Sequence, residues 1–156
     1  MVLKRHMCAV VAGAAVLCLT ACGGEEEVRN AATATIEQNG VTMTMSFDAK
    51  GDEVTRITQE SVIDLSGYSE EMIDALNSTV ESAEETYAEV EGVEYSCGQE
   101  DGKMVERIVI PTDKDTLRAA VEQGLLPVDD EDVTQLSLKA TTDNLEAAGW
   151  TVETAE

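Results

Sequence analysis

The dipeptide Asn39-Gly40 and its flanks constrain the fold more tightly than any other part of this sequence. Apolar residues alternate with hydroxyl-bearing residues over 32–36, at the start of the segment 32–38, and again over 41–47. Asn-Gly is the preferred dipeptide of a two-residue hairpin turn, because both positions of that turn require positive φ. The segment therefore predicts two antiparallel strands, and the apolar residues that face one another are Ile36 and Met43, Ala34 and Met45, and Ala32 and Phe47.

The predicted sheet has one apolar face and one face rich in hydroxyl groups. An antiparallel sheet with one covered and one wetted face produces this alternation, so we expect helices to pack against the face that carries the two methionines. A three-residue loop at 50–52 predicts a third strand over 53–65 and places Met45 opposite Ile57. The hydroxyl face is a candidate partner surface, although β-propensity alone explains threonine there. Its residues are Thr33, Thr35, Thr42, Thr44 and Ser46.

A long amphipathic helix is predicted after the third strand. Ser69 is a suitable N-cap, because its side-chain oxygen can accept from the free N–H groups of the first turn. Apolar residues then recur every three or four positions as far as Gly92, which predicts a helix of about six turns whose apolar stripe covers the sheet. The stripe consists of Met72, Leu76, Val80, Ala83, Tyr87 and Val90.

A second hairpin is predicted between strands 93–100 and 103–112, because Asp101-Gly102 is another favourable turn dipeptide. In this register Tyr95 lies opposite Ile108, and Val93 lies opposite Ile110. Cys97 shares the parity of Tyr95, so its side chain is expected to lean toward the core.

The rest of the chain predicts two shorter helices and an α+β fold. One helix covers 113–123 and stops at Gly124, and the other is capped by Thr142 and closed by Gly149. Between them, alternation within 128–140 favours a short strand, and 150–152 is expected to return along the sheet. The predicted architecture is an antiparallel β-meander sheet with one long and two shorter helices packed on its apolar face.

The amino terminus has the pattern of a secretory signal. Lys4 and Arg5 precede an uncharged stretch over 7–19 that is too short to span a bilayer. The tetrapeptide Leu19-Thr20-Ala21-Cys22 that follows resembles the lipobox of bacterial lipoproteins, in which the cysteine thiol takes a diacylglycerol and the bond before it is cut. The alternative is a plain signal peptide with a chance cysteine at its end.

This pattern predicts the organisation and the location of the chain. Residues 1–21 are a lipoprotein signal peptide, 22–30 an acidic tether and 31–156 a single α+β domain. We expect the mature protein on the extracytoplasmic face of the cell membrane, attached through lipid on Cys22.

The charge of the predicted mature chain excludes several partners. It keeps eight of the ten Lys and Arg residues and all 32 Asp and Glu residues, a formal charge of −24. Such a charge repels phosphates, so nucleic acid is not an expected partner. It also repels anionic headgroups, although acidity can serve solubility alone. We expect a monomer whose partner is an unknown envelope protein or ligand.

Few residues remain for catalysis. His6, the only histidine, leaves with the signal, which excludes Ser-His-Asp and Cys-His pairs and histidine-ligated metals. Cys8 and Cys18 leave too, and Cys22 carries lipid, so Cys97 is the only thiol and no disulfide can form within the chain. A lone cysteine among acids has a raised pKa, which favours a structural role. We therefore expect no enzyme and no cofactor.

Acidic residues leave two alternative hypotheses open. The run Asp129-Asp130-Glu131-Asp132 offers oxygen ligands that calcium prefers, although its spacing does not match a calcium loop and a solvated turn is the simpler interpretation. A calcium-responsive envelope protein is one alternative. The other is an enzyme that works through carboxylates alone, which requires two acids in one concave pocket.

The order of features resembles the YehR-like family of small bacterial lipoproteins over about 22–152. The segments that carry the resemblance are the lipobox, the acidic spacer, Ile36-Glu37-Gln38-Asn39-Gly40-Val41, Lys50-Gly51-Asp52-Glu53-Val54, the long helix, the second hairpin and Leu145-Glu146-Ala147-Ala148-Gly149-Trp150. The resemblance implies a compact α+β fold, no known function and no catalytic residues to carry over. The strong acidity of this chain departs from many relatives and weakens any expectation of a shared partner. Our leading hypothesis is a non-catalytic, membrane-tethered binding or interaction module of the cell envelope.

Overall fold

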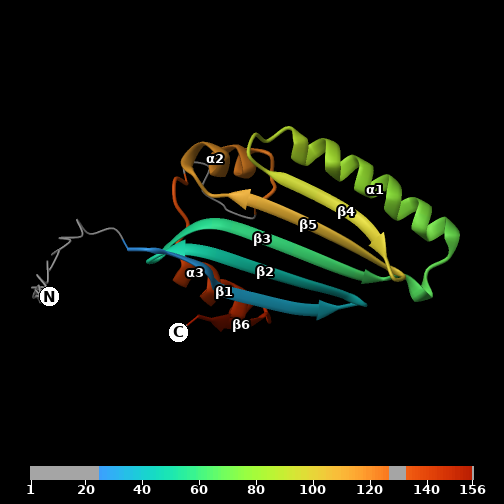
Figure 1. Ribbon diagram of the computed structural model, residues 1–156, viewed down its shortest axis with the longest axis horizontal. Helices are drawn as coiled ribbons and strands as arrows, with labels where there is room; N and C mark the ends of the chain where they lie inside the picture. Colours follow the sequence, from blue (N-terminus) through green and yellow to red (C-terminus); the bar gives the residue numbers. More distant parts are fainter. Residues whose placement is uncertain (1–24, 127–132, 156) are drawn as a thin grey trace, which may run out of the picture.

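The computed structural model describes residues 25–126 and 133–155, which form an open antiparallel sheet with helices (Figure 1). The strand order is β4-β5-β3-β2-β1-β6, so the first three strands form a meander and the β4–β5 hairpin is added beside β3. The fold is α+β, as the sequence predicts. The elements are β1 (Glu27–Gln38), β2 (Val41–Lys50), β3 (Glu53–Asp64), a short 3-10 turn (Leu65–Gly67), α1 (Glu70–Ala88), β4 (Glu94–Glu100), β5 (Lys103–Pro111), α2 (Lys114–Glu122), α3 (Leu138–Ala147) and β6 (Thr151–Thr154).

The first hairpin has the predicted register. Asn39 and Gly40 form the turn with φ of 55° and 78°. Ile36 pairs with Met43, Ala34 with Met45, Ala32 with Phe47, Thr35 with Thr44 and Thr33 with Ser46. Ala32, Ala34 and Phe47 are fully buried, while the hydroxyl-bearing residues of the other face are half-buried.

The register predicted for β3 is wrong by two residues. Met45 pairs with Gln59, and Ile57 pairs with Phe47. The turn contains two residues instead of three, because Lys50 pairs directly with Glu53, and an irregularity beside Asp48 shifts the register by one more. Two shifts of one residue preserve the parity of the strand, so Ile57 still lies on the apolar face.

The long helix begins as predicted but lies differently on the sheet. The hydroxyl of Ser69 accepts from the backbone N–H of Met72. Met72 itself is 50% exposed, and the half-buried side of α1 is formed by Ile73, Leu76, Val80, Ala83 and Tyr87. The helix packs along β4 near the edge of the sheet, and none of its residues is buried (Figure 1). The expectation that this stripe covers the sheet is therefore only partly met.

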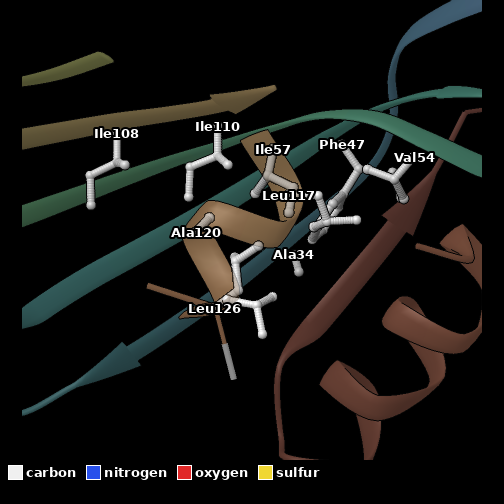
Figure 2. Close-up of a cluster of buried hydrophobic side chains, with 11 residues drawn as sticks. Ala34, Phe47, Val54, Ile57, Ile108, Ile110, Leu117, Ala120 and Leu126 are labelled. Carbon is white, nitrogen blue, oxygen red and sulfur yellow. The ribbon is translucent and has the colours of Figure 1, made fainter. Parts of the chain in front are cut away.

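The core forms where α2 packs on the sheet (Figure 2). Asp113 caps this helix by accepting from the backbone N–H of Thr116. Leu117 and Ala120 are fully buried against side chains of β2, β3 and β5, which Figure 2 shows pointing toward the helix. Gly124 follows the helix with φ of 71°, as its predicted role as a stop requires.

The second hairpin is confirmed, with one difference at its beginning. Tyr95 pairs with Ile108. Val93 lies just before β4, so the predicted pair of Val93 and Ile110 is not part of the ladder, although Val93 packs against the core.

The strand predicted before the last helix is wrong for the residues that the structure describes. Residues 133–136 have no regular structure, and Ser137 makes a single bridge to Glu53. Ser137, and not Thr142, caps α3 by accepting from the backbone N–H of Ala140. Thr142 lies inside the helix, where its hydroxyl donates to the carbonyl of Leu138. The helix starts earlier than predicted because Ser137 is held by Asp52 of the β2–β3 turn.

The chain ends on the sheet as predicted. Gly149 closes α3 with φ of 91°, and β6 runs antiparallel to β1 with Val152 opposite Ala34.

The strand β1 includes residues that the sequence analysis assigns to the tether. It begins at Glu27, whose carboxylate accepts from the hydroxyl of Thr55 at 2.5 Å. Asn30, with φ of 49°, donates its backbone N–H to Asp48. The signal peptide and Cys22 lie outside the described residues.

Replacing Leu117 with alanine should lower the free energy of unfolding by about 2–5 kcal/mol, because it leaves a cavity where α2 meets the sheet. Met72→Ala, on the exposed side of α1, should change it by no more than about 0.5 kcal/mol. Urea unfolding followed by circular dichroism measures both. Equal losses in the two variants would contradict the burial described above.

Candidate functional site

A cavity of about 690 Å³ lies between the apolar face of the sheet and the helices. Its floor is formed by side chains of β2, β3 and β5, and several of them are visible in Figure 2. These floor residues are Met43, Met45, Phe47, Ile57, Gln59, Ile108 and Ile110. Met43 and Met45 remain half-buried, because α1 lies toward β4 and leaves the middle of the sheet partly uncovered.

The walls of the cavity come from separate parts of the chain. Tyr87 is contributed by α1, and Leu125 and Leu126 follow α2. The opposite wall is formed by the start of α3, by its inner side and by the tryptophan that follows it. Its residues are Gln135, Leu136, Ser137, Ala140, Thr141, Asn144, Leu145 and Trp150.

The wall at the start of α3 is fixed to the β2–β3 turn. The carboxylate of Asp52 accepts from the hydroxyl of Ser137 at 2.7 Å and from the backbone N–H of Lys139 at 2.8 Å. The backbone of Asp52 accepts from the N–H of Leu138, and the N–H of Val54 donates to the carbonyl of Leu136. We call these four bonds the Asp52 clamp. The bonds to Ser137 and Lys139 hold the pKa of Asp52 below its usual range.

The wall at α1 rests on two stacked tyrosines. The rings of Tyr87 and Tyr95 lie 5.0 Å apart at an angle of 9°, and the hydroxyl of Tyr95 donates to Glu106 at 2.9 Å. Burial raises the pKa of both phenols, and for Tyr95 the bond to Glu106 adds to the effect. These phenols therefore stay neutral and act as packing and hydrogen-bonding groups.

Cys97 lies near this tyrosine pair, and its side chain is on the face of the sheet predicted from the alternation along β4. It is half-buried on the apolar face, opposite Glu106. Burial raises the pKa of its thiol, and the charge of Glu106 raises it further. A protonated thiol is a poor nucleophile, so this environment fits the structural role expected for Cys97.

The cavity can hold an uncharged, largely apolar molecule. Its volume falls in the range of about 300–1,000 Å³ that is typical of small-molecule sites. The described lining contains no Asp, Glu, Lys or Arg side chain. Its polar side chains are neutral amides, hydroxyls and an indole, supplied by Gln59, Tyr87, Gln135, Ser137, Thr141, Asn144 and Trp150. The two converging carboxylates that an acid–base enzyme would need are not found in this lining.

The structure does not place the other predicted sites in this cavity. Leu19, Thr20, Ala21 and Cys22 lie outside the described residues, as do Asp129, Asp130, Glu131 and Asp132, so lipidation and calcium binding stay predictions. Among the described residues, no cluster of three or more acidic, cysteine or histidine side chains is arranged to hold a metal ion. No helix in the described part of the chain is long and apolar enough to cross a membrane.

The predicted hydroxyl face lies on the other side of the sheet. It continues across β3 through Thr58 and Glu60, which pair with Ser46 and Thr44. At its β6 side a smaller hollow of about 360 Å³ is lined by Thr33, Thr35, Glu37, Thr151 and Glu153.

Sequence reasoning missed the cavity, although one signal was available. Two methionines follow one another on the apolar face of β2, and Met is a flexible side chain that often lines adaptable binding surfaces. Which residues of the helices meet those methionines depends on tertiary contacts that are distant in sequence.

Comparison with known proteins supports the fold and the resemblance noted above. A family model described as a protein of unknown function (DUF1307) matches residues 30–151. The uncharacterized lipoprotein Lin0239 of Listeria innocua serovar 6a is 27% identical over 92 residues, which cover 59% of this chain and 58% of that relative. The match thus spans little more than half the length of the relative.

Two solved structures share the fold. The solution structure of Escherichia coli YehR matches with a TM-score of 0.64 at 19% identity and covers 86% of this chain and 96% of that one. A solution structure of a protein from Streptococcus pneumoniae TIGR4 matches with a TM-score of 0.57 at 11% identity and covers 98% and 99% of the two chains. The predicted resemblance to YehR-like lipoproteins of unknown function is confirmed.

The Asp52 clamp should make stability depend on pH. Because the folded pKa of Asp52 is lowered, its carboxylate stabilises the fold above the unfolded value of about 4, and this contribution is lost as the pH falls through the folded pKa. Asp52→Asn should therefore lower the Tm at neutral pH, and the difference from the unsubstituted protein should shrink in acid. Thermal melts at a series of pH values measure this.

Asp74→Asn, an exposed acid on α1, is the matched control and should leave the Tm nearly unchanged throughout. A Tm difference for Asp52→Asn that is as large in acid as at neutral pH would show that the carboxylate charge does not hold the clamp.

Proposed function

Since the chain belongs to the DUF1307 family of proteins of unknown function, we propose, on the basis of the cavity, that this protein is a non-catalytic, lipid-anchored binding module of the cell envelope. The observation that carries this proposal is the cavity of about 690 Å³ with an uncharged, mainly apolar lining. Apolar cavities with a few neutral polar groups suit ligand binding, because burial of apolar surface supplies affinity and the polar groups orient the ligand.

The properties of the lining favour binding over catalysis. A general acid or base must be an ionisable side chain within hydrogen-bond reach of its substrate. On the α1 side, Tyr87 lines the cavity, and Tyr95 and Cys97 lie near it; burial raises the pKa of each of these groups, so they remain protonated at neutral pH. The carboxylate of Glu106 accepts from the hydroxyl of Tyr95 and is not part of the described lining. Amides and hydroxyls then hold a ligand without reacting with it.

The proposed anchor is the diacylglyceryl group on Cys22. The lipobox pattern at 19–22 supports it, and so does the relative from Listeria innocua, which is named a lipoprotein. Two acyl chains provide stable attachment, whereas one chain binds a membrane only marginally. This arrangement would keep the cavity close to a bilayer on the extracytoplasmic side.

Filling the cavity should weaken the binding of an apolar probe. Ala140 lines the cavity on α3, so Ala140→Phe places an aromatic ring in the space that a ligand needs. We expect the affinity for the neutral dye N-phenyl-1-naphthylamine to fall about tenfold, which corresponds to about 1.4 kcal/mol. Titration of the dye into the purified full chain, followed by dye fluorescence, measures this.

Ala147→Phe is the matched control, because Ala147 lies on the same helix and is exposed, as Ala140 is, but does not line the cavity. Its affinity for the dye should match that of the unsubstituted protein. Absence of dye binding to the unsubstituted protein, or equal affinities of the two variants, would refute the proposed binding site.

Lipid attachment should depend on one cysteine. Cells that express the chain and are fed an alkynyl palmitate should label it, and Cys22→Ser should abolish the label because the thioether cannot form. Cys97→Ser removes the cysteine predicted to remain as a free thiol and should keep the label. Gel fluorescence after coupling to a dye gives the readout, and a labelled Cys22→Ser protein would disprove the assignment.

A further inference from the structure

We propose that the cavity takes an acyl chain of a membrane lipid with a zwitterionic or uncharged headgroup, drawn from the bilayer beside which the domain is tethered. This inference rests on the proposed function and specifies its ligand. It follows from the position of the cavity relative to the tether and from the charge of the molecule.

The floor of the cavity lies over the middle of the sheet, and one of its walls lies at the end of the sheet where the chain enters. Glu25 and Glu27 lead into β1, and Glu27 pairs with Lys50 at the beginning of the β2–β3 turn. The carboxylate of Glu25 lies so close to Gly51 that a β-carbon there would overlap it. The residues at the start of β1 thus pack against the β2–β3 turn, which contains Asp52.

The same turn holds one wall of the cavity. Ser137 lines the cavity and donates to Asp52 at 2.7 Å, and Leu136 lines it and accepts from Val54. Figure 1 shows α2 and α3, whose residues and flanks contribute to the walls, at the end of the sheet where β1 begins. The tether and the cavity wall therefore meet at one turn.

The reach of the tether is short. Cys22 precedes Glu25 by three residues, which span at most about 10 Å when fully extended. Lipid on Cys22 would hold the β2–β3 turn close to the membrane surface, and the cavity wall with it. Acyl chains of that bilayer are then the apolar molecules at the highest local concentration.

The charge of the molecule selects among membrane lipids. The described lining offers no cation to a phosphate or carboxylate headgroup. The predicted mature chain carries a formal charge of −24, which repels anionic lipids from its surface. The neutral side-chain amides of Gln135 and Asn144 can donate to ester or hydroxyl groups at the end of an acyl chain. A lipid with a zwitterionic or uncharged headgroup needs no cation in the lining, is not repelled as an anion, and offers groups to which the neutral polar side chains can bond.

Trp150 provides a direct test, because it is the only tryptophan of the chain and lines the cavity. The full lipoprotein, isolated from membranes, is reconstituted into vesicles of phosphatidylcholine whose acyl chains carry bromine, a short-range quencher of tryptophan fluorescence. We expect Trp150 to lose at least half of its emission relative to vesicles without bromine. Ala140→Phe should restore most of the emission, and Ala147→Phe should not.

A second series tests the headgroup. Brominated phosphatidylglycerol, present as a minor component among unbrominated phosphatidylcholine, should quench less than brominated phosphatidylcholine at the same fraction. The difference should narrow in 1 M salt, where the screening length falls to about 3 Å. Equal quenching by the two lipids at low salt would overturn the headgroup selectivity.

The outcomes separate this inference from the proposed function. If the neutral dye binds but brominated lipid leaves Trp150 unquenched, the acyl-chain inference fails and the binding function stands. That result is also the one expected if the protein's own acyl chains fill the site. If Ala140→Phe is quenched as strongly as the unsubstituted protein, Trp150 meets lipid outside the cavity and the inference is overturned. If the dye does not bind and brominated lipid does not quench Trp150, both the proposed function and the acyl-chain inference are refuted.

Discussion

Every other feature of this structure depends on the need to cover one apolar sheet face. Strict alternation in β1 and β2 places Ala32, Ala34 and Phe47 on one side, and water would otherwise contact all of them. The tightest cover is supplied by α2, where Leu117 and Ala120 are fully buried. The helix α1 packs nearer the β4 edge, and α3 is held to the β2–β3 turn. The space enclosed among the three helices and the sheet is the cavity.

The parts of the fold that local chemistry determines could be predicted from sequence. Asn39-Gly40 fixed both the turn and the pairing around it, because a two-residue turn leaves one register. Ser69 caps the helix expected to follow it, since its side-chain oxygen satisfies a free backbone N–H group, and the helix expected over 113–123 forms with Asp113 as its cap. Parity placed Cys97 on the apolar face correctly, because side chains in a strand alternate between faces.

Other parts depend on contacts between residues far apart in the chain, and prediction failed there. Ser137 caps α3 while bound to Asp52, which lies 85 residues earlier, so local sequence favoured Thr142 instead. The irregularity beside Asp48 changed the register of β3 without a turn signal of its own. The cavity depends on where three helices settle on the sheet, and the pattern of α1 alone does not specify that it stays half-exposed.

The edges of the sheet also bear on how such a protein behaves at a surface. Anchored molecules diffuse in two dimensions, where exposed strand edges meet in a restricted set of orientations and edge-to-edge pairing is encouraged. One outer strand, β6, is only four residues long and carries Glu153. The other, β4, begins and ends with glutamate and is accompanied by α1. The short length of β6 and the glutamates at both borders therefore oppose edge-to-edge pairing between neighbouring copies.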